Sequence, residues 1–221
     1  MTFIFSMLVT LSALQAAESV TYSSGCGNAA SITSGKYTTT INGIERDYIV
    51  RVTAYNVTQD SSKYGNGSYY GLLNLANEAV IFVAPQGLDN GWSNINYDDM
   101  TFADTIVRTL DDGLCVDKDQ RFVVGFNFGG SMTNAIAKSG RGTTFKAAAV
   151  LSGTDYTTAL GEPAPIGFLV SHGVSDPGNL ISKGRSMRDV FVEVNDCTNQ
   201  TAPEPAVGSH SHIKTRTQTS C

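Results

Sequence analysis

The pattern of hydrophobic and polar positions divides the chain into strand-like and helix-like segments. Residues 37–53 alternate on both sides of Asn42-Gly43, and such a pair between alternating runs predicts a β-hairpin with a type I′ turn. After residue 68, continuous apolar runs of strand length alternate with segments of helical spacing. The predicted strands are 79–85, 121–126, 146–153 and 165–173, and helices are predicted from residue 69 and over 98–110, 131–139 and 180–195.

This succession of elements predicts the fold class. Strands that are apolar on both faces and alternate with helices are typical of a parallel sheet that is covered on both sides. A strand is expected before the helix at residue 69, yet residues 54–68 contain no apolar run. We therefore expect an α/β fold with a mostly parallel sheet, helices on both faces, the early hairpin at its edge and one strand missing.

The first residues have the pattern of a secretion signal. Residues 3–14 form an apolar run that is too short to span a bilayer but fits a signal-peptide core, and the small residues Ala16 and Ala17 follow it. We expect residues 1–17 to be a signal peptide and residues 18–221 to form a single domain, which its length suits. A membrane anchor is the alternative reading of the run. After cleavage, we expect no membrane association.

Cysteines and glycosylation sequons also favour an extracellular location. The four cysteines are widely spaced and form no CxxC pair, which favours disulfides in an oxidising compartment over a zinc site. Three pairings are possible, and the spacing does not choose among them. The cysteines are Cys26, Cys115, Cys197 and Cys221, and the candidate glycosylation sites are Asn56, Asn66 and Asn199.

The charge balance excludes one class of partner. The chain has 15 basic and 20 acidic side chains, a net charge of −5, and no Lys/Arg cluster. Because affinity for phosphates depends on clustered cationic side chains, we expect no nucleic-acid partner.

The most informative motif follows the predicted strand 121–126. Gly125-Phe126-Asn127-Phe128-Gly129 joins a buried strand to a helix, which is the context of a G-x-S-x-G nucleophile elbow. Its central residue is Asn127 instead of serine. An amide has no ionisable hydroxyl and cannot form an acyl-enzyme.

Several segments together resemble the secreted fungal feruloyl esterases, which are serine esterases related to polyhydroxybutyrate-depolymerase-like and acetylxylan esterases. They occur in the same order as in that family and cover most of residues 25–221. The segments are 34–52, 69–94, 98–132, 172–177, 184–197 and 202–215.

The resemblance implies an α/β-hydrolase fold and a carboxylic ester hydrolase that acts on feruloylated arabinoxylan, a plant cell-wall polysaccharide, without a cofactor. Its mechanism would be a Ser-His-Asp triad with backbone N–H groups around the oxyanion. Transferred residue by residue, the nucleophile position falls on Asn127. The triad acid falls on Asp176, which follows the predicted strand 165–173; its alternative role is that of a turn residue before Pro177.

Three departures from the family pattern predict impaired catalysis. Asn127 replaces the nucleophilic serine. The family's oxyanion loop and its strand, expected before residue 69, are absent, and the family's catalytic histidine would fall beyond Cys221. Because loss of one triad member costs several orders of magnitude in rate, we expect a truncated, inactive member of the family.

Several other residues have two possible roles each. Ser131 is an alternative nucleophile or a helix-capping residue, His210 and His212 are alternative bases or solvated loop residues, and His172 is expected to fix a strand–loop junction. Trp92 and Phe126 either line a cleft or pack in the core. We expect Asp98, Asp99 and Asp104 to favour a helix N-terminus instead of binding a metal.

Three functional hypotheses follow. The first is a secreted feruloyl-esterase-like protein of xylan degradation that does not hydrolyse esters. The second is a non-catalytic module that binds carbohydrate or phenolic groups, and the third is the product of a damaged gene or gene model.

Overall fold

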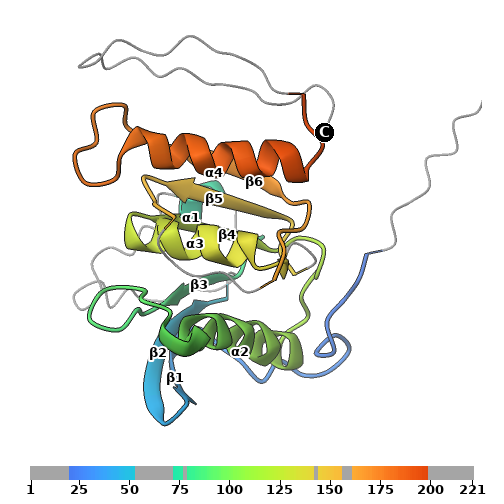
Figure 1. Ribbon diagram of the computed structural model, residues 1–221. Helices are drawn as coiled ribbons and strands as arrows, with labels where there is room; N and C mark the ends of the chain where they lie inside the picture. Colours follow the sequence, from blue (N-terminus) through green and yellow to red (C-terminus); the bar gives the residue numbers. More distant parts are fainter. Residues whose placement is uncertain (1–19, 53–71, 77–78, 142–143, 156–160, 199–221) are drawn as a thin grey trace, which may run out of the picture.

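The computed structural model describes residues 20–52, 72–76, 79–141, 144–155 and 161–198. Within these ranges the strands form two three-stranded sheets, with orders β1-β2-β3 and β4-β5-β6, and helices pack against both (Figure 1). The strands are β1 (Gly35–Ile41), β2 (Ile44–Arg51), β3 (Phe82–Pro85), β4 (Phe122–Phe126), β5 (Ala147–Leu151) and β6 (Gly167–Ser171). The helices are α1 (Leu72–Leu75), the short 3₁₀ helix η2 (Ile95–Tyr97), α2 (Asp98–Gly113), α3 (Phe128–Lys138) and α4 (Ile181–Val194).

The first sheet is antiparallel throughout. β1 and β2 form the predicted hairpin, and both turn residues have positive φ angles, 48° at Asn42 and 84° at Gly43, as a type I′ turn requires. β3 then pairs antiparallel with β2, from Tyr48 opposite Pro85 to Arg51 opposite Phe82. The sequence predicted that only the hairpin would be antiparallel, at the edge of a parallel sheet. The antiparallel sheet is larger because β3 joins it, and the apolar run at 79–85 does not reveal which strand it pairs with.

The second sheet is parallel, as predicted. β4 pairs with β5 and β5 with β6. α3 forms the crossover connection from β4 to β5, and α4 follows β6. α3 begins at Phe128, three residues before the predicted start, because the elbow at Asn127 opens directly into the helix. The described strands fall into two separate sheets, and the prediction that one strand is missing stays untested. Residues 54–68, where that strand was sought, lie outside the described residues.

The core consists of apolar clusters between the helices and the sheets. Phe102 on α2 contacts the edge of the Tyr48 ring on β2, with ring centroids 6.1 Å apart. On the parallel sheet, Phe191 of α4 stacks on Phe168 of β6 at 4.0 Å. Met100 of α2 packs with the apolar residues of α3 and joins the two halves. These contacts fix the parallel strands whose carboxyl ends carry the candidate site.

A disulfide joins Cys26, in the segment before β1, to Cys115, just after the end of α2. Cys197 is also disulfide-bonded, and its partner lies outside the described residues. Disulfide formation is therefore confirmed. In the described part of the chain, every helix is too short or too polar to span a bilayer. The predicted signal peptide and the three glycosylation sequons lie outside the described residues.

Candidate active site

The turn between β4 and α3 has the backbone geometry of a nucleophile elbow. Asn127 has φ 53° and ψ −114°, a conformation that is sterically costly for any residue with a side chain. Its N–H donates to the carbonyl of Leu151 at 3.0 Å, and its own carbonyl accepts the N–H of Ser131 at 2.9 Å. The exposed Asn127 side chain therefore stands at the carboxyl end of β4, where α/β sheets place their sites.

Glycines make this turn possible because they let the backbone at the ends of β4 and β5 approach the start of α3 closely. A Cβ atom at Gly125 would lie 2.0 Å from the carbonyl oxygen of Gly129, and one at Gly153 would lie 2.6 Å from the carbonyl carbon of Gly130. These contacts hold α3 against the ends of β4 and β5. The glycine pattern noted in the sequence is therefore a requirement of this turn.

Asp176 lies in the loop between β6 and α4. Its Oδ1 accepts the N–H groups of Asn179 and Gly178, both at 2.9 Å. Both backbone hydrogen bonds lower the pKa of the Asp176 carboxyl below its ordinary value, and the one from Asn179 has the larger effect. The charge of His172 adds a smaller effect in the same direction. Asp176 is therefore a carboxylate at neutral pH.

Asn179 joins the two positions that the resemblance identified. Its Nδ2 donates to the carbonyl of Ser152 at 2.7 Å and reaches the Oδ1 of Asn127 at 3.4 Å, while its N–H binds Asp176. Asn127 and Asp176 thus lie at one end of the parallel sheet, linked through a single residue. Asn179 was not predicted from the sequence as a site residue. The signal was available, because an Asp whose side chain caps the next two or three N–H groups is a recurrent turn, here Asp176-Pro177-Gly178-Asn179.

His172 is the only histidine among the described residues. Its Nε2 donates to the carbonyl of Asn179, so it fixes the junction between β6 and the Asp176 loop, as the sequence predicted. Its Nδ1 is buried without a hydrogen-bond partner, and a Cβ at Gly184 of α4 would lie 2.8 Å from that nitrogen. His172 is therefore a packed residue, and it is tied to Asn179 instead of facing Asn127. His210 and His212 lie outside the described residues.

Ser131 is not placed to act as a nucleophile. It is 1% exposed, and its Oγ donates to the carbonyl of Asn127 at 3.2 Å and accepts the N–H of Thr154 at 2.9 Å. Both interactions fix the backbone of the elbow. The structural role that the sequence favoured for Ser131 agrees with these contacts, and the alternative nucleophile role stays untested.

The remaining candidates are dispersed. Trp92 packs against two of the core clusters, whereas the Phe126 side chain is half exposed beside the elbow. The three acidic candidates at the start of α2 each face a different partner. Asp98 accepts the side-chain amide of Asn42, Asp99 binds Arg46, and Asp104 binds both Nε and Nη2 of Arg141.

No protein-family model matches the chain. Feruloyl esterase D of Neurospora crassa is 36% identical over 216 residues, covering 86% of this chain and 74% of that protein. Feruloyl esterase C of Emericella nidulans is 34% identical over 214 residues, which are 87% of this chain and 76% of that protein. Probable feruloyl esterase C of Aspergillus oryzae is 33% identical over 231 residues, with coverages of 95% and 81%.

A solved structure described as a thermostable esterase has a similar fold. Its TM-score is 0.54 at 17% sequence identity, over 73% of this chain and 52% of that chain. The chain thus spans about half the length of that esterase. This similarity supports the α/β-hydrolase type of fold that was expected.

Proposed function

The chain belongs to the feruloyl esterase family, and from that premise we propose that it is an extracellular member that recognises feruloylated arabinoxylan without hydrolysing its esters at an enzyme-like rate. The observation that carries the proposal is the identity of the residue at the elbow. The turn is formed as a serine hydrolase needs it, but the side chain it presents is the carboxamide of Asn127.

A serine esterase works by transferring the hydroxyl proton to a base while the oxygen attacks the ester carbonyl. An amide nitrogen at this position is a poor nucleophile, and the amide oxygen of Asn127 already receives the Asn179 side chain. The one described histidine is tied to Asn179 and does not replace the base. Asp176 can still orient an imidazole, but an orienting carboxylate alone supplies no acyl-enzyme chemistry.

The alignment with the Neurospora protein contains positions that have no counterpart in this chain. It runs over 216 residues but covers 86% of the 221 residues here, which is about 190 residues. About 26 positions of the relative's aligned stretch therefore have no counterpart in this chain.

The test is an ester hydrolysis assay. We expect the full chain to release no more ferulic acid from methyl ferulate than an Asn127→Ala variant does, with the Neurospora relative as the active reference. Chromatography of the released acid gives the rate. Turnover that Asn127→Ala abolishes would contradict the proposal, and turnover that only Ser131→Ala abolishes would return the nucleophile role to Ser131.

Binding without hydrolysis is favoured by the apolar side chains that border the elbow. Phe126 and Phe128 flank Asn127 and are 54% and 51% exposed, and Leu180, next to Asn179, is 58% exposed. Aromatic and aliphatic side chains beside a few amides suit a phenolic ring with polar substituents. The arrangement therefore supports recognition of a feruloyl group at the former catalytic position.

A retention experiment on insoluble arabinoxylan tests this recognition. Replacing Phe128 by Ala should weaken retention about fivefold or more, because the lost ring contact is worth about 1 kcal/mol or more. Phe122→Ala is the matched control, since Phe122 is similarly exposed but lies at the opposite end of β4. Equal retention of both variants, or equal retention after alkaline removal of ferulate from the polymer, would show that the elbow does not recognise the phenolic group.

A further inference from the structure

The carboxamide of Asn127 is exposed, while its backbone is held in place. The Asn127 N–H donates to the carbonyl of Leu151, and the Asn127 carbonyl accepts the N–H and the hydroxyl of Ser131 at 2.9 and 3.2 Å. Its φ of 53° lies in the left-handed region, which asparagine tolerates better than most residues with a side chain. The Cβ atom is therefore fixed, and only the side-chain torsions decide where the carboxamide points.

Asn179, at the neighbouring loop, is anchored through both its main chain and its side chain. Its N–H donates to Asp176 at 2.9 Å, and its carbonyl accepts the Nε2 N–H of His172. Its side-chain Nδ2 donates to the carbonyl of Ser152 at 2.7 Å. A polar side chain with bonds of this kind is held in one orientation, so the Nδ2 group of Asn179 has a defined position just after β5.

This Nδ2 group orients the carboxamide of Asn127. It lies 3.4 Å from the Oδ1 of Asn127, and an amide nitrogen carries two N–H groups, so one can bind Ser152 while the other faces that oxygen. With its oxygen directed toward Asn179, Asn127 keeps its own Nδ2 on the other side of the carboxamide. In the described part of the chain, the Nδ2 of Asn127 has no acceptor. It is a donor available to a ligand.

Apolar side chains border this donor. Phe126 and Phe128 flank Asn127, Leu180 follows Asn179, and all three side chains are more than half exposed. When a ligand covers such a border, the donor loses contact with water, and a hydrogen bond in the resulting low dielectric is stronger than one in water. The matching ligand therefore has an apolar body and a hydrogen-bond acceptor.

The acceptor that suits this position carries no charge. The lowered pKa of Asp176 keeps a carboxylate bound to the N–H of Asn179, at the same end of the parallel sheet. A second negative charge there would be repelled, whereas an ester carbonyl oxygen accepts a hydrogen bond without that cost. The position thus favours an ester over the free acid that its hydrolysis would release.

We propose that Asn127 donates through Nδ2 to the carbonyl oxygen of a bound feruloyl ester, and that Asn179 is the positioning residue for this contact. The residue that stands where the nucleophile is expected thereby recognises the ester group that a nucleophile would attack. The contact rests on the proposed function, because it names the atom through which the elbow binds the feruloyl group.

The experiment is a calorimetric titration of the full chain with methyl ferulate, ferulate and isoeugenol, which has the same ring and propenyl chain but no carbonyl group. Asn127→Asp keeps the shape of the side chain and replaces the donor by an acceptor. We expect it to weaken methyl ferulate binding about fivefold or more, because one hydrogen bond is lost, and to leave isoeugenol binding within about twofold. Asn179→Ala should cause a smaller loss with the same selectivity for methyl ferulate. Ferulate should bind more weakly than methyl ferulate.

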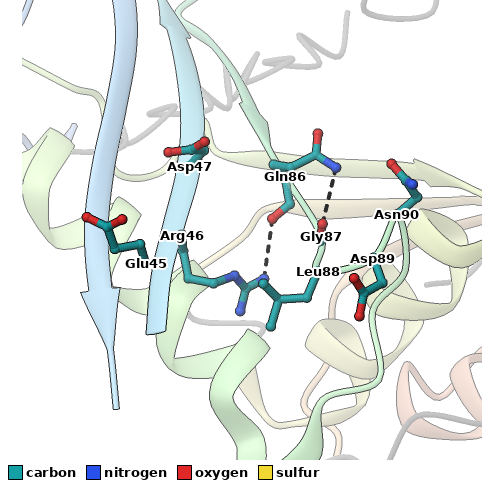
Figure 2. Close-up of a pocket in the computed structure, with 8 residues that line it drawn as sticks. All are labelled: Glu45, Arg46, Asp47, Gln86, Gly87, Leu88, Asp89 and Asn90. Atoms are coloured by element: carbon teal, nitrogen blue, oxygen red, sulfur yellow. Dashed lines mark hydrogen bonds between the residues drawn. The ribbon is translucent and has the colours of Figure 1, made fainter. Parts of the chain in front are cut away.

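Asn90→Asp is the matched control. Asn90 is also an exposed asparagine with a positive φ angle, 60°, and its conversion to Asp should leave every affinity unchanged. Figure 2 shows it in the turn after β3, beside a pocket to which no residue of the elbow contributes. Thermal unfolding of each variant verifies that it is folded, and if Asn127→Asp does not fold, the selectivity of Asn179→Ala decides.

Each outcome decides the proposal. A loss confined to methyl ferulate in both elbow variants supports it. Unchanged binding in Asn127→Asp, or an equal loss for methyl ferulate and isoeugenol, overturns the carbonyl contact and leaves the proposed recognition of the phenolic ring intact. A loss that Asn179→Ala does not share overturns the positioning role, and tighter binding of ferulate than of methyl ferulate overturns the uncharged acceptor. Absence of binding of all three ligands overturns the contact and the proposed recognition together.

Discussion

Replacing Asp99 by Ala should destabilise the protein by about 3–5 kcal/mol, the cost expected when one partner of a buried ion pair is removed. The Arg46 and Asp99 side chains are 1% and 4% exposed, so the remaining guanidinium would be left without its counter-charge. Asp99 also accepts the N–H of Asn94 at 2.6 Å, and that donor would lose its partner too. Urea unfolding followed by circular dichroism measures the change in the free energy of unfolding.

An exposed ion pair provides the control for this prediction. Asp189 pairs with Arg188 at 2.6 Å, and both side chains are substantially exposed to water. Asp189→Ala should therefore cost less than about 1 kcal/mol. If Asp99→Ala and Asp189→Ala shift the free energy of unfolding equally, the buried pair does not hold α2 against the antiparallel sheet. A double Arg46→Leu/Asp99→Leu variant should recover part of the loss, because no unpaired charge remains.

Gly125→Ala should have the second-largest effect, a loss of about 3 kcal/mol in the free energy of unfolding. The added methyl group would overlap the carbonyl of Gly129, and backbone atoms can relieve that overlap only if α3 moves away from β4. Because α3 is almost wholly buried, that movement also disturbs its packing. Thermal or urea unfolding measures the loss.

Gly129→Ala is the matched control in the same turn. A Cβ at Gly129 meets nothing within 4 Å, and alanine favours the helix in which this residue lies. The variant should unfold at the same urea concentration as the natural chain or a higher one. A Gly125→Ala variant as stable as Gly129→Ala would show that the close approach at the elbow is not required.

The sequence predicted local structure well where one segment determines it. The Asn42-Gly43 hairpin depends on its own turn residues, and β4, β5 and β6 depend on continuous apolar runs; all of them form as expected. The pairing of β3 with β2 was not predicted, because an apolar run of four to seven residues is compatible with either sheet. Strand partners are decided by long-range packing, which periodicity does not report.

In the candidate site, too, local features could be predicted from the sequence and long-range contacts could not. The glycines around Asn127 revealed the elbow, since a turn of that kind needs them whatever the central residue is. The contacts of Asn179 could not be read from the sequence, because they join residues 52 and 27 positions apart. The acidic residues of α2 were assigned to its helix dipole, yet Asp99 is also half of a buried ion pair with Arg46, 53 positions away. The catalytic and binding roles of Asn127 and Asp176 stay predictions until the assays above are done.

The bond between Cys26 and Cys115 has a consequence for how the protein must be produced. It closes a loop of 89 residues that contains β1, β2, β3 and the whole of α2. A chain synthesised where glutathione keeps thiols reduced would lack this cross-link and would sample many more open conformations before folding. Recombinant preparations from a bacterial cytosol and from an oxidising export route should therefore not be treated as the same material.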